Sequence, residues 1–164
     1  MKKIVFFLLP VILISIHFLF SQAREAKQYT VEVENEGHKA MVIIKAKPFD
    51  PKRHQIEMKK EGKGSYCSKI DGRVPHGEDG GVPCVEIAGI IAWMDGKMIP
   101  IDKALYGDCF EPNLSYDHVR LRLSEDGHAA LLTMSNGDGA GGYDVTWVIN
   151  KGSPCARFLE TLCS

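Results

Sequence analysis

The 164-residue sequence lacks the short motifs that identify many enzymes. It contains no G-x-S-x-G nucleophile elbow, no H-E-x-x-H zinc motif, no P-loop and no dinucleotide-binding fingerprint. It also lacks the basic excess of a dedicated nucleic-acid binder, because 20 Lys and Arg stand against 21 Asp and Glu. With 45% apolar and 25% charged residues, the composition is that of an ordinary globular protein and excludes a disordered tail.

Long apolar runs are absent except at the N-terminus. Two lysines precede an uncharged stretch over residues 4–20, and Ser21 and Ala23 place small residues at −3 and −1 before Arg24. This pattern is typical of a secretory signal peptide. We predict cleavage near Ala23, which leaves a secreted or periplasmic protein with no stable membrane span; an N-terminal membrane anchor is the alternative. The compact Met-Lys-Lys leader favours a bacterial source.

Cysteines are few and odd in number, and all five follow the leader. No C-x-x-C pair is present, which disfavours zinc, whereas export permits disulfide bonds. We predict Cys67–Cys84, which would close a glycine-rich segment, and Cys155–Cys163, which would tie down the C-terminus. Cys109 is then unpaired, although spacing alone leaves the other pairings open. A nucleophilic role for Cys109 is disfavoured because the adjacent aspartate opposes thiolate formation.

The chain after the leader has no long amphipathic helix and no internal repeat, and short strand patterns run along most of it. Alternating apolar residues or short apolar runs bounded by turn residues predict strands over 29–34, 39–47, 56–59, 85–94, 97–101, 119–123, 128–134 and 143–149. Residues 156–162 fit a last strand or a short helix. We therefore predict one all-β domain over 24–164, an antiparallel β-sandwich or open barrel of about eight or nine short strands with little helix.

Local signals refine these strands. Gly89 inside its strand predicts a β-bulge, Asp95 followed by glycine predicts a hairpin turn, and Pro100 predicts an edge strand. Both tryptophans, Trp93 and Trp147, lie in apolar strands, and we expect both to pack in the core.

Two glycine-rich segments, 71–83 and 135–144, interrupt the strands. Loops at the end of a β-sandwich are held still by the scaffold and often carry function. Here they combine exposed backbone with acidic side chains, and His76 and Tyr143 are natural anchors. The candidate ligand-binding residues are His76, Glu78, Asp79, Gly80, Gly81, Asp138, Tyr143 and Asp144.

We therefore expect an exported binding module that recognises a protein or glycan of the cell envelope through these loops, without a cofactor. The residues leave two alternatives open. Acid-plus-glycine loops also suit calcium, although the match to known calcium loops is weak. The second alternative is a small secreted hydrolase. Its catalytic groups would be acids such as Asp79, Asp138 and Asp144, together with His76.

Overall fold

The computed structural model describes residues 26–137, 141–152 and 154–161. Ten strands cover most of them, against the eight or nine that the sequence predicts. The strands are β1 (Lys27–Asn35), β2 (His38–Pro48), β3 (Ile56–Glu61), β4 (Gly64–Ile70), β5 (Val85–Met94), β6 (Lys97–Pro100), β7 (Val119–Leu123), β8 (Ala129–Asn136), β9 (Tyr143–Asn150) and β10 (Ala156–Thr161). Two short 3-10 helices, η1 (Pro51–Arg53) and η2 (Lys103–Leu105), complete the described elements.

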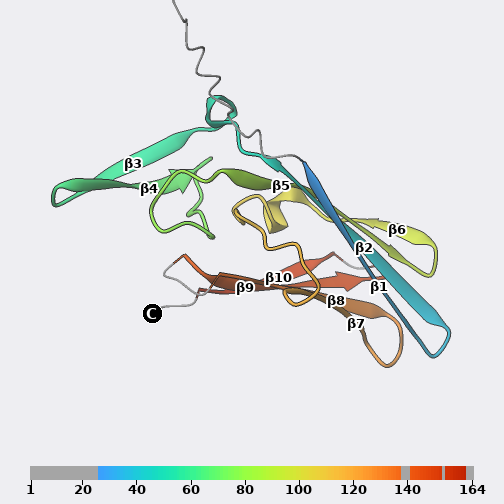
Figure 1. The fold of residues 1–164 in the computed structure, drawn as a ribbon. Helices are drawn as coiled ribbons and strands as arrows, with labels where there is room; N and C mark the ends of the chain where they lie inside the picture. Colours follow the sequence, from blue (N-terminus) through green and yellow to red (C-terminus); the bar gives the residue numbers. More distant parts are fainter. Residues whose placement is uncertain (1–25, 138–140, 153, 162–164) are drawn as a thin grey trace, which may run out of the picture.

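Two four-stranded antiparallel sheets form the body of the molecule, which confirms the predicted sandwich. The first sheet has the order β1-β2-β5-β6 and the second β10-β9-β8-β7. Figure 1 shows them as two layers, with the β3–β4 hairpin projecting to one side. In the described part of the chain no helix has the length and apolar character needed to cross a bilayer.

The core lies between the two sheets and follows from alternation along the strands. In β9 the inward Tyr143, Val145, Trp147 and Ile149 are all buried, and β2 contributes Ala40, Val42 and Ile44 from the opposite layer. Because successive side chains in a strand point to opposite faces, one inward set per strand fills the space between the sheets. A smaller apolar cluster of Phe49, Cys67, Ile70 and Phe110 lies at the base of the β3–β4 hairpin.

The local turn and edge signals are confirmed. Asp95 and Gly96 both have positive φ, 48° and 77°, as the tight turn between β5 and β6 requires. Pro100 lies in β6, an edge strand, and the register between β2 and β5 shifts next to Gly89. Asp102 caps η2 by accepting a hydrogen bond from the Ala104 amide at 2.8 Å.

Two predictions need correction. The strand β4 was not expected, because its sequence of small and polar residues shows little alternation. Trp147 is buried, but Trp93 is not part of the core. In β5 the inward positions are Ile90, Ala92 and Met94, so Trp93 lies on the outer face. Both faces of β5 are apolar, and the residues alone do not show which one is buried.

Candidate functional site

The two glycine-rich segments meet at one end of the sandwich. The Gly77 amide donates to the carbonyl of Gly141 at 3.0 Å. A Cβ on Gly141 would lie 2.6 Å from the carbonyl carbon of Glu78, so glycine is required for this close approach. This contact therefore brings the two glycine-rich segments together at one end of the molecule.

His76 forms an isolated parallel β-bridge with Cys109. Its amide donates to the Asp108 carbonyl at 2.9 Å, and its carbonyl accepts from the Phe110 amide at 2.8 Å. The imidazole is half-buried, with its ring centre 6.2 Å from that of Tyr143. Burial lowers the pKa of His76 below its usual value, and the nearby Asp108 carboxylate offsets part of this effect.

Tyr143 lies in the core rather than on the surface where we expected an anchor. Its side chain is fully buried, and its hydroxyl donates to the Phe110 carbonyl at 3.1 Å. The Asn136 amide donates to the same carbonyl at 3.2 Å. Burial holds the pKa of Tyr143 well above its usual value, so it remains a neutral donor. Tyr143 thus braces the loop over 108–112 from within the core.

Four of the other candidate residues lie together on the first glycine-rich segment. Glu78 and Asp79 lie beside Gly141 at a surface hollow of about 300 Å³. Gly80 and Gly81 follow them, and the Gly80 carbonyl accepts from the Cys67 amide at 2.7 Å.

Asp144 is on the outer face of the second sheet, opposite Ser135 and Glu160, and so lies apart from the loops. Asp138 falls outside the described residues. The structure therefore does not place Asp144 with His76 as the hydrolase alternative needs.

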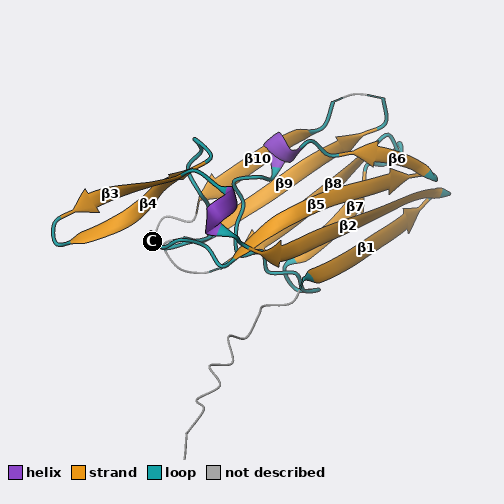
Figure 2. Ribbon diagram, turned by 90° about the horizontal axis from the view of Figure 1, so that it is seen from above, coloured by secondary structure: helices purple, strands orange, loops and turns teal. Residues whose placement is uncertain are grey.

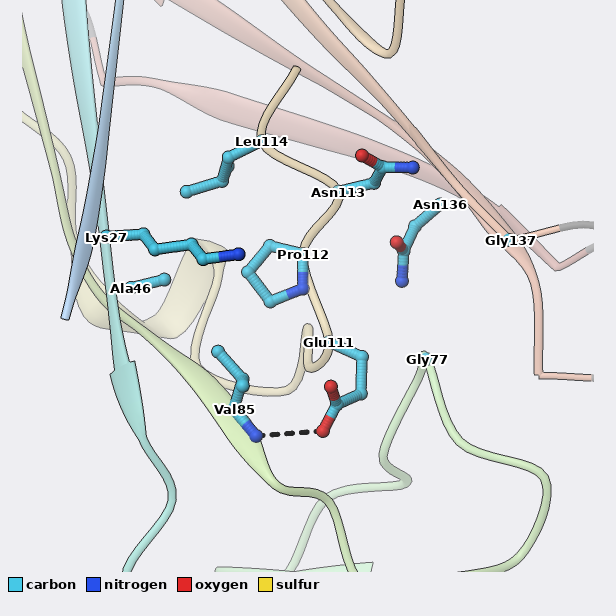
Figure 3. A pocket seen from close by; sticks show the side chains of 10 residues that line it. All are labelled: Lys27, Ala46, Gly77, Val85, Glu111, Pro112, Asn113, Leu114, Asn136 and Gly137. Atoms are coloured by element: carbon cyan, nitrogen blue, oxygen red, sulfur yellow. Dashed lines mark hydrogen bonds between the residues drawn. The ribbon is translucent and has the colours of Figure 1, made fainter. Parts of the chain in front are cut away.

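A larger cavity of about 550 Å³ adjoins the hollow and shares three lining residues with it, Gly77, Asn136 and Gly137. We call the two together the loop-end groove. Figure 3 shows the cavity, with the Lys27 side chain reaching in from β1 toward Pro112. The other lining residues are Ala46, Val85, Glu111, Asn113 and Leu114.

The floor of the cavity is held by Glu111. Its carboxylate accepts from the Val85 amide at 2.8 Å and from the Cys84 amide. Glu111 also has a positive φ of 48°, which non-glycine residues rarely adopt. These contacts fix the carboxylate to the start of β5, so Glu111 shapes the cavity wall. Sequence reasoning missed both Glu111 and Lys27, since neither carries a local motif.

An ionic cluster centred on the buried Asp108 lies next to His76, whose amide bonds the Asp108 carbonyl. Asp108 is 4% exposed. Its carboxylate pairs with Arg73 and with both terminal nitrogens of Arg157, and the Arg157 Nη2 to Oδ2 distance is 3.1 Å. The adjacent Cys109 thiol is buried, and burial together with Asp108 raises its pKa to about 12. Burial and this raised pKa both disfavour a nucleophilic role for Cys109, as does the adjacent aspartate.

The predicted disulfide between Cys67 and Cys84 is not formed in the structure. Both thiols are free, as are those of Cys109 and Cys155. Cys67 is buried in β4, where its thiol faces the Lys69 carbonyl at 3.7 Å, whereas Cys84 is exposed just before β5. Because the Cys155 thiol is free, the predicted Cys155–Cys163 bond is not formed in the structure either; Cys163 itself lies outside the described residues.

The described residues form no group of three His, Cys, Asp or Glu side chains arranged to hold a metal ion. Among the described residues, the loop-end groove offers the cation of Lys27, the carboxylates of Glu78, Asp79 and Glu111, two side-chain amides, backbone groups and a short apolar wall. Comparison with known proteins identifies no matching family model, curated protein or solved structure.

Proposed function

We propose that this protein is an exported binding module that holds an extended segment of an envelope protein in the loop-end groove. The observation that carries the proposal is the meeting of Gly77 with Gly141, which joins the two hollows into one surface next to Lys27. Because glycines carry no side chain, the backbone of a ligand can approach these loops closely. A rigid two-sheet scaffold supports these loops.

The lining favours a peptide over a glycan. Sugar sites commonly offer an aromatic face for stacking, but no aromatic ring is among the described residues that line either hollow. Val85, Pro112 and Leu114 instead provide an apolar wall, and Asn113 and Asn136 provide amides. This mixture matches a main chain carrying one or two apolar side chains, with an acidic side chain next to Lys27 in the cavity and a basic one next to Asp79 in the hollow.

Site-specific cross-linking tests the proposal. A photo-activated amino acid is placed at Asn113 in the cavity and, as matched controls, at Lys63 in the β3–β4 turn and at Thr146 on the outer second sheet. In cells, we expect one protein adduct from position 113, at least fivefold above either control. Lys27→Glu should reduce this adduct about tenfold because it reverses the charge at the cavity, while Lys63→Glu should not.

Two outcomes contradict the proposal. Adducts of equal yield from all three positions would show that the groove has no special role. An adduct from position 113 that glycan-degrading enzymes remove, and proteases do not, would assign the groove to a sugar.

A further inference from the structure

Positive charge is concentrated in one short part of the chain. Residues 51–70, which include η1 and the β3–β4 hairpin, contain six basic and two acidic side chains, a net charge of +4. The rest of the chain after the predicted leader contains 12 basic and 19 acidic residues, a net charge of −7. We call residues 51–70 the basic arm. Its cations are Lys52, Arg53, Lys59, Lys60, Lys63 and Lys69.

The cations of the basic arm face solvent and have no carboxylate partner among the described residues. Lys69 is half-buried, and the other five are exposed. The ion pairs of described lysine and arginine side chains all lie elsewhere, as at Lys47, whose Nζ is 3.1 Å from Glu86. Glu57 and Glu61, the acids of the arm, are exposed as well and leave it with its net positive charge. The arm therefore presents this charge to an external partner.

The β3–β4 hairpin extends beyond the two sheets. Figures 1 and 2 show it from two directions, and in both views no other described segment lies beside its outer half. The small apolar cluster holds its base, where the Cys67 amide also donates to the Gly80 carbonyl at 2.7 Å. Glu78 and Asp79 immediately precede Gly80, so the acidic part of the protein begins at this base. No residue of the outer half, over 58–66, is buried, so this half adds nothing to the core.

A basic hollow of about 520 Å³ lies where the arm begins. Its described lining residues are Lys52, Arg53, His54, Gln55 and Asp71. The carboxylate of Asp71 is already engaged, because it accepts from the Gln55 amide at 2.9 Å and lies 2.8 Å from the His54 Nδ1. The two exposed cations of η1 are therefore left to an anionic group that enters the hollow.

We propose that the basic arm docks this protein on the surface of an anionic phospholipid bilayer. Clusters of about four to eight Lys and Arg residues commonly bind such surfaces. The hairpin reaches past the sheets and so meets a flat surface ahead of them. The hollow beside Lys52 and Arg53 receives the phosphate of one headgroup. The net charge of −7 on the rest of the protein is repelled by the same surface and turns the arm toward it.

Two features favour a bilayer over an acidic protein as the partner. Five of the six cations are lysines, whose point charges on flexible stems suit a diffuse negative surface. Arginine is the residue that suits the fixed geometry of a single carboxylate. Protein interfaces also depend on large apolar or aromatic anchors, whereas Met58 is the one large apolar side chain exposed in the outer half of the hairpin.

Vesicle flotation tests the proposal on the chain from Arg24 onward, which contains every described element. The vesicles are phosphatidylcholine with about one third phosphatidylglycerol, and pure phosphatidylcholine is the comparison. At low ionic strength we expect the protein to float with the anionic vesicles, and about tenfold less of it with the neutral ones. Binding should fall about tenfold in roughly 0.5 M salt, where charges are screened within a few ångströms.

Paired substitutions separate the arm from the overall charge. Lys59→Gln with Lys60→Gln removes two charges from the hairpin, and Lys97→Gln with Lys103→Gln removes two from exposed positions outside the arm. The two double variants have the same net charge. We expect the hairpin variant to bind anionic vesicles about tenfold less than the wild type, and the control variant to stay within about twofold of it.

Lys52→Gln with Arg53→Gln tests the hollow and decides the question if the hairpin variant does not fold. Both side chains are exposed, so the fold should persist, which circular dichroism checks. We expect about tenfold weaker binding to anionic vesicles.

Three results would overturn the proposal. One is no binding to anionic vesicles at low ionic strength. Another is binding that neither arm variant weakens more than the control variant does. The third is binding to soluble polyphosphate or polyglutamate without binding to vesicles, which would assign the arm to a dissolved polyanion or an acidic protein.

Discussion

Gly77 and Gly141 show how single residues decide whether the two loops can meet. A Cβ on Gly77 would lie 2.2 Å from the Phe110 carbonyl oxygen, and one on Gly141 would lie 2.6 Å from the Glu78 carbonyl carbon. Both distances are shorter than any side chain tolerates. The sequence identifies the segments as glycine-rich, but it does not distinguish these glycines from Gly37 or Gly62, which only turn the chain.

The four described thiols differ in exposure, and this difference predicts their reactivity. At pH 8 we expect native Cys84 to react with iodoacetamide, while Cys67 and Cys109 stay unmodified until the protein is unfolded in guanidine. Cys84 is exposed, whereas Cys67 and Cys109 are buried and shielded from the reagent. Burial also raises the pKa of Cys67 and raises that of Cys109 to about 12, which further slows their reaction. Peptide mass spectrometry after timed labelling measures the three rates.

Native Cys84 serves as the internal control for reagent activity. Rapid labelling of Cys109 in the native protein would show that its thiol is accessible to solvent and not buried. A Cys67–Cys84 cross-linked peptide under non-reducing conditions would instead restore the disulfide that the sequence predicts.

At the scale of elements, alternation predicted most strands and their inward faces. The patterns of β1, β7 and β9 each have one apolar face and one polar face, so the sequence orients them correctly. In β5 both faces are apolar, and the residue pattern contains no signal that Trp93 points away from the core. The register shows what the pattern does not: Trp93 lies between Met41 of β2 and Met98 of β6 on the outer face of the first sheet.

The candidate site was predicted only in part, for a related reason. The two glycine-rich segments were found from composition, but Lys27, Glu111 and the Asp108 cluster were not. Arg73 and Arg157 are 84 positions apart in the chain and meet only through Asp108. Contacts of this kind depend on the tertiary fold, and no local pattern encodes them.

Asp108 ties the loop over 71–84 and strand β10 to the 3-10 segment around η2, and its loss should weaken all three. We expect Asp108→Asn to lower the free energy of unfolding by about 2–4 kcal/mol, because both arginines lose a buried partner. The side chains of Arg73 and Arg157 are 35% and 18% exposed, which keeps the cost below that of a fully buried pair. Urea denaturation followed by circular dichroism measures the change.

Asp79→Asn is the matched control, since Asp79 is an exposed acid on the neighbouring loop. We expect it to change stability by less than about 0.5 kcal/mol. Equal stability of the two variants would show that the cluster does not hold these elements together.

For the molecule as a whole, the loop-end groove lies where both sheets contribute to one end of the sandwich. Lys27 and Ala46 come from β1 and β2, Val85 begins β5, and Asn136 ends β8 in the second sheet. The groove therefore depends on the packing of the two sheets as well as on the loops.

The relation between the leader and the fold makes a final prediction at this scale. The predicted cut before Arg24 lies three residues ahead of Lys27, where β1 begins, so cleavage removes no residue of either sheet. When the full chain is expressed in a bacterium with a Sec pathway, we expect a mature product that begins at Arg24. The periplasmic fraction should contain it, and intact-mass measurement with N-terminal sequencing identifies the new end. Ala23→Arg, which places a bulky charged residue at −1, should block processing and retain the chain at the membrane. Recovery of the wild type with residues 1–23 still attached would contradict signal cleavage and favour the N-terminal anchor.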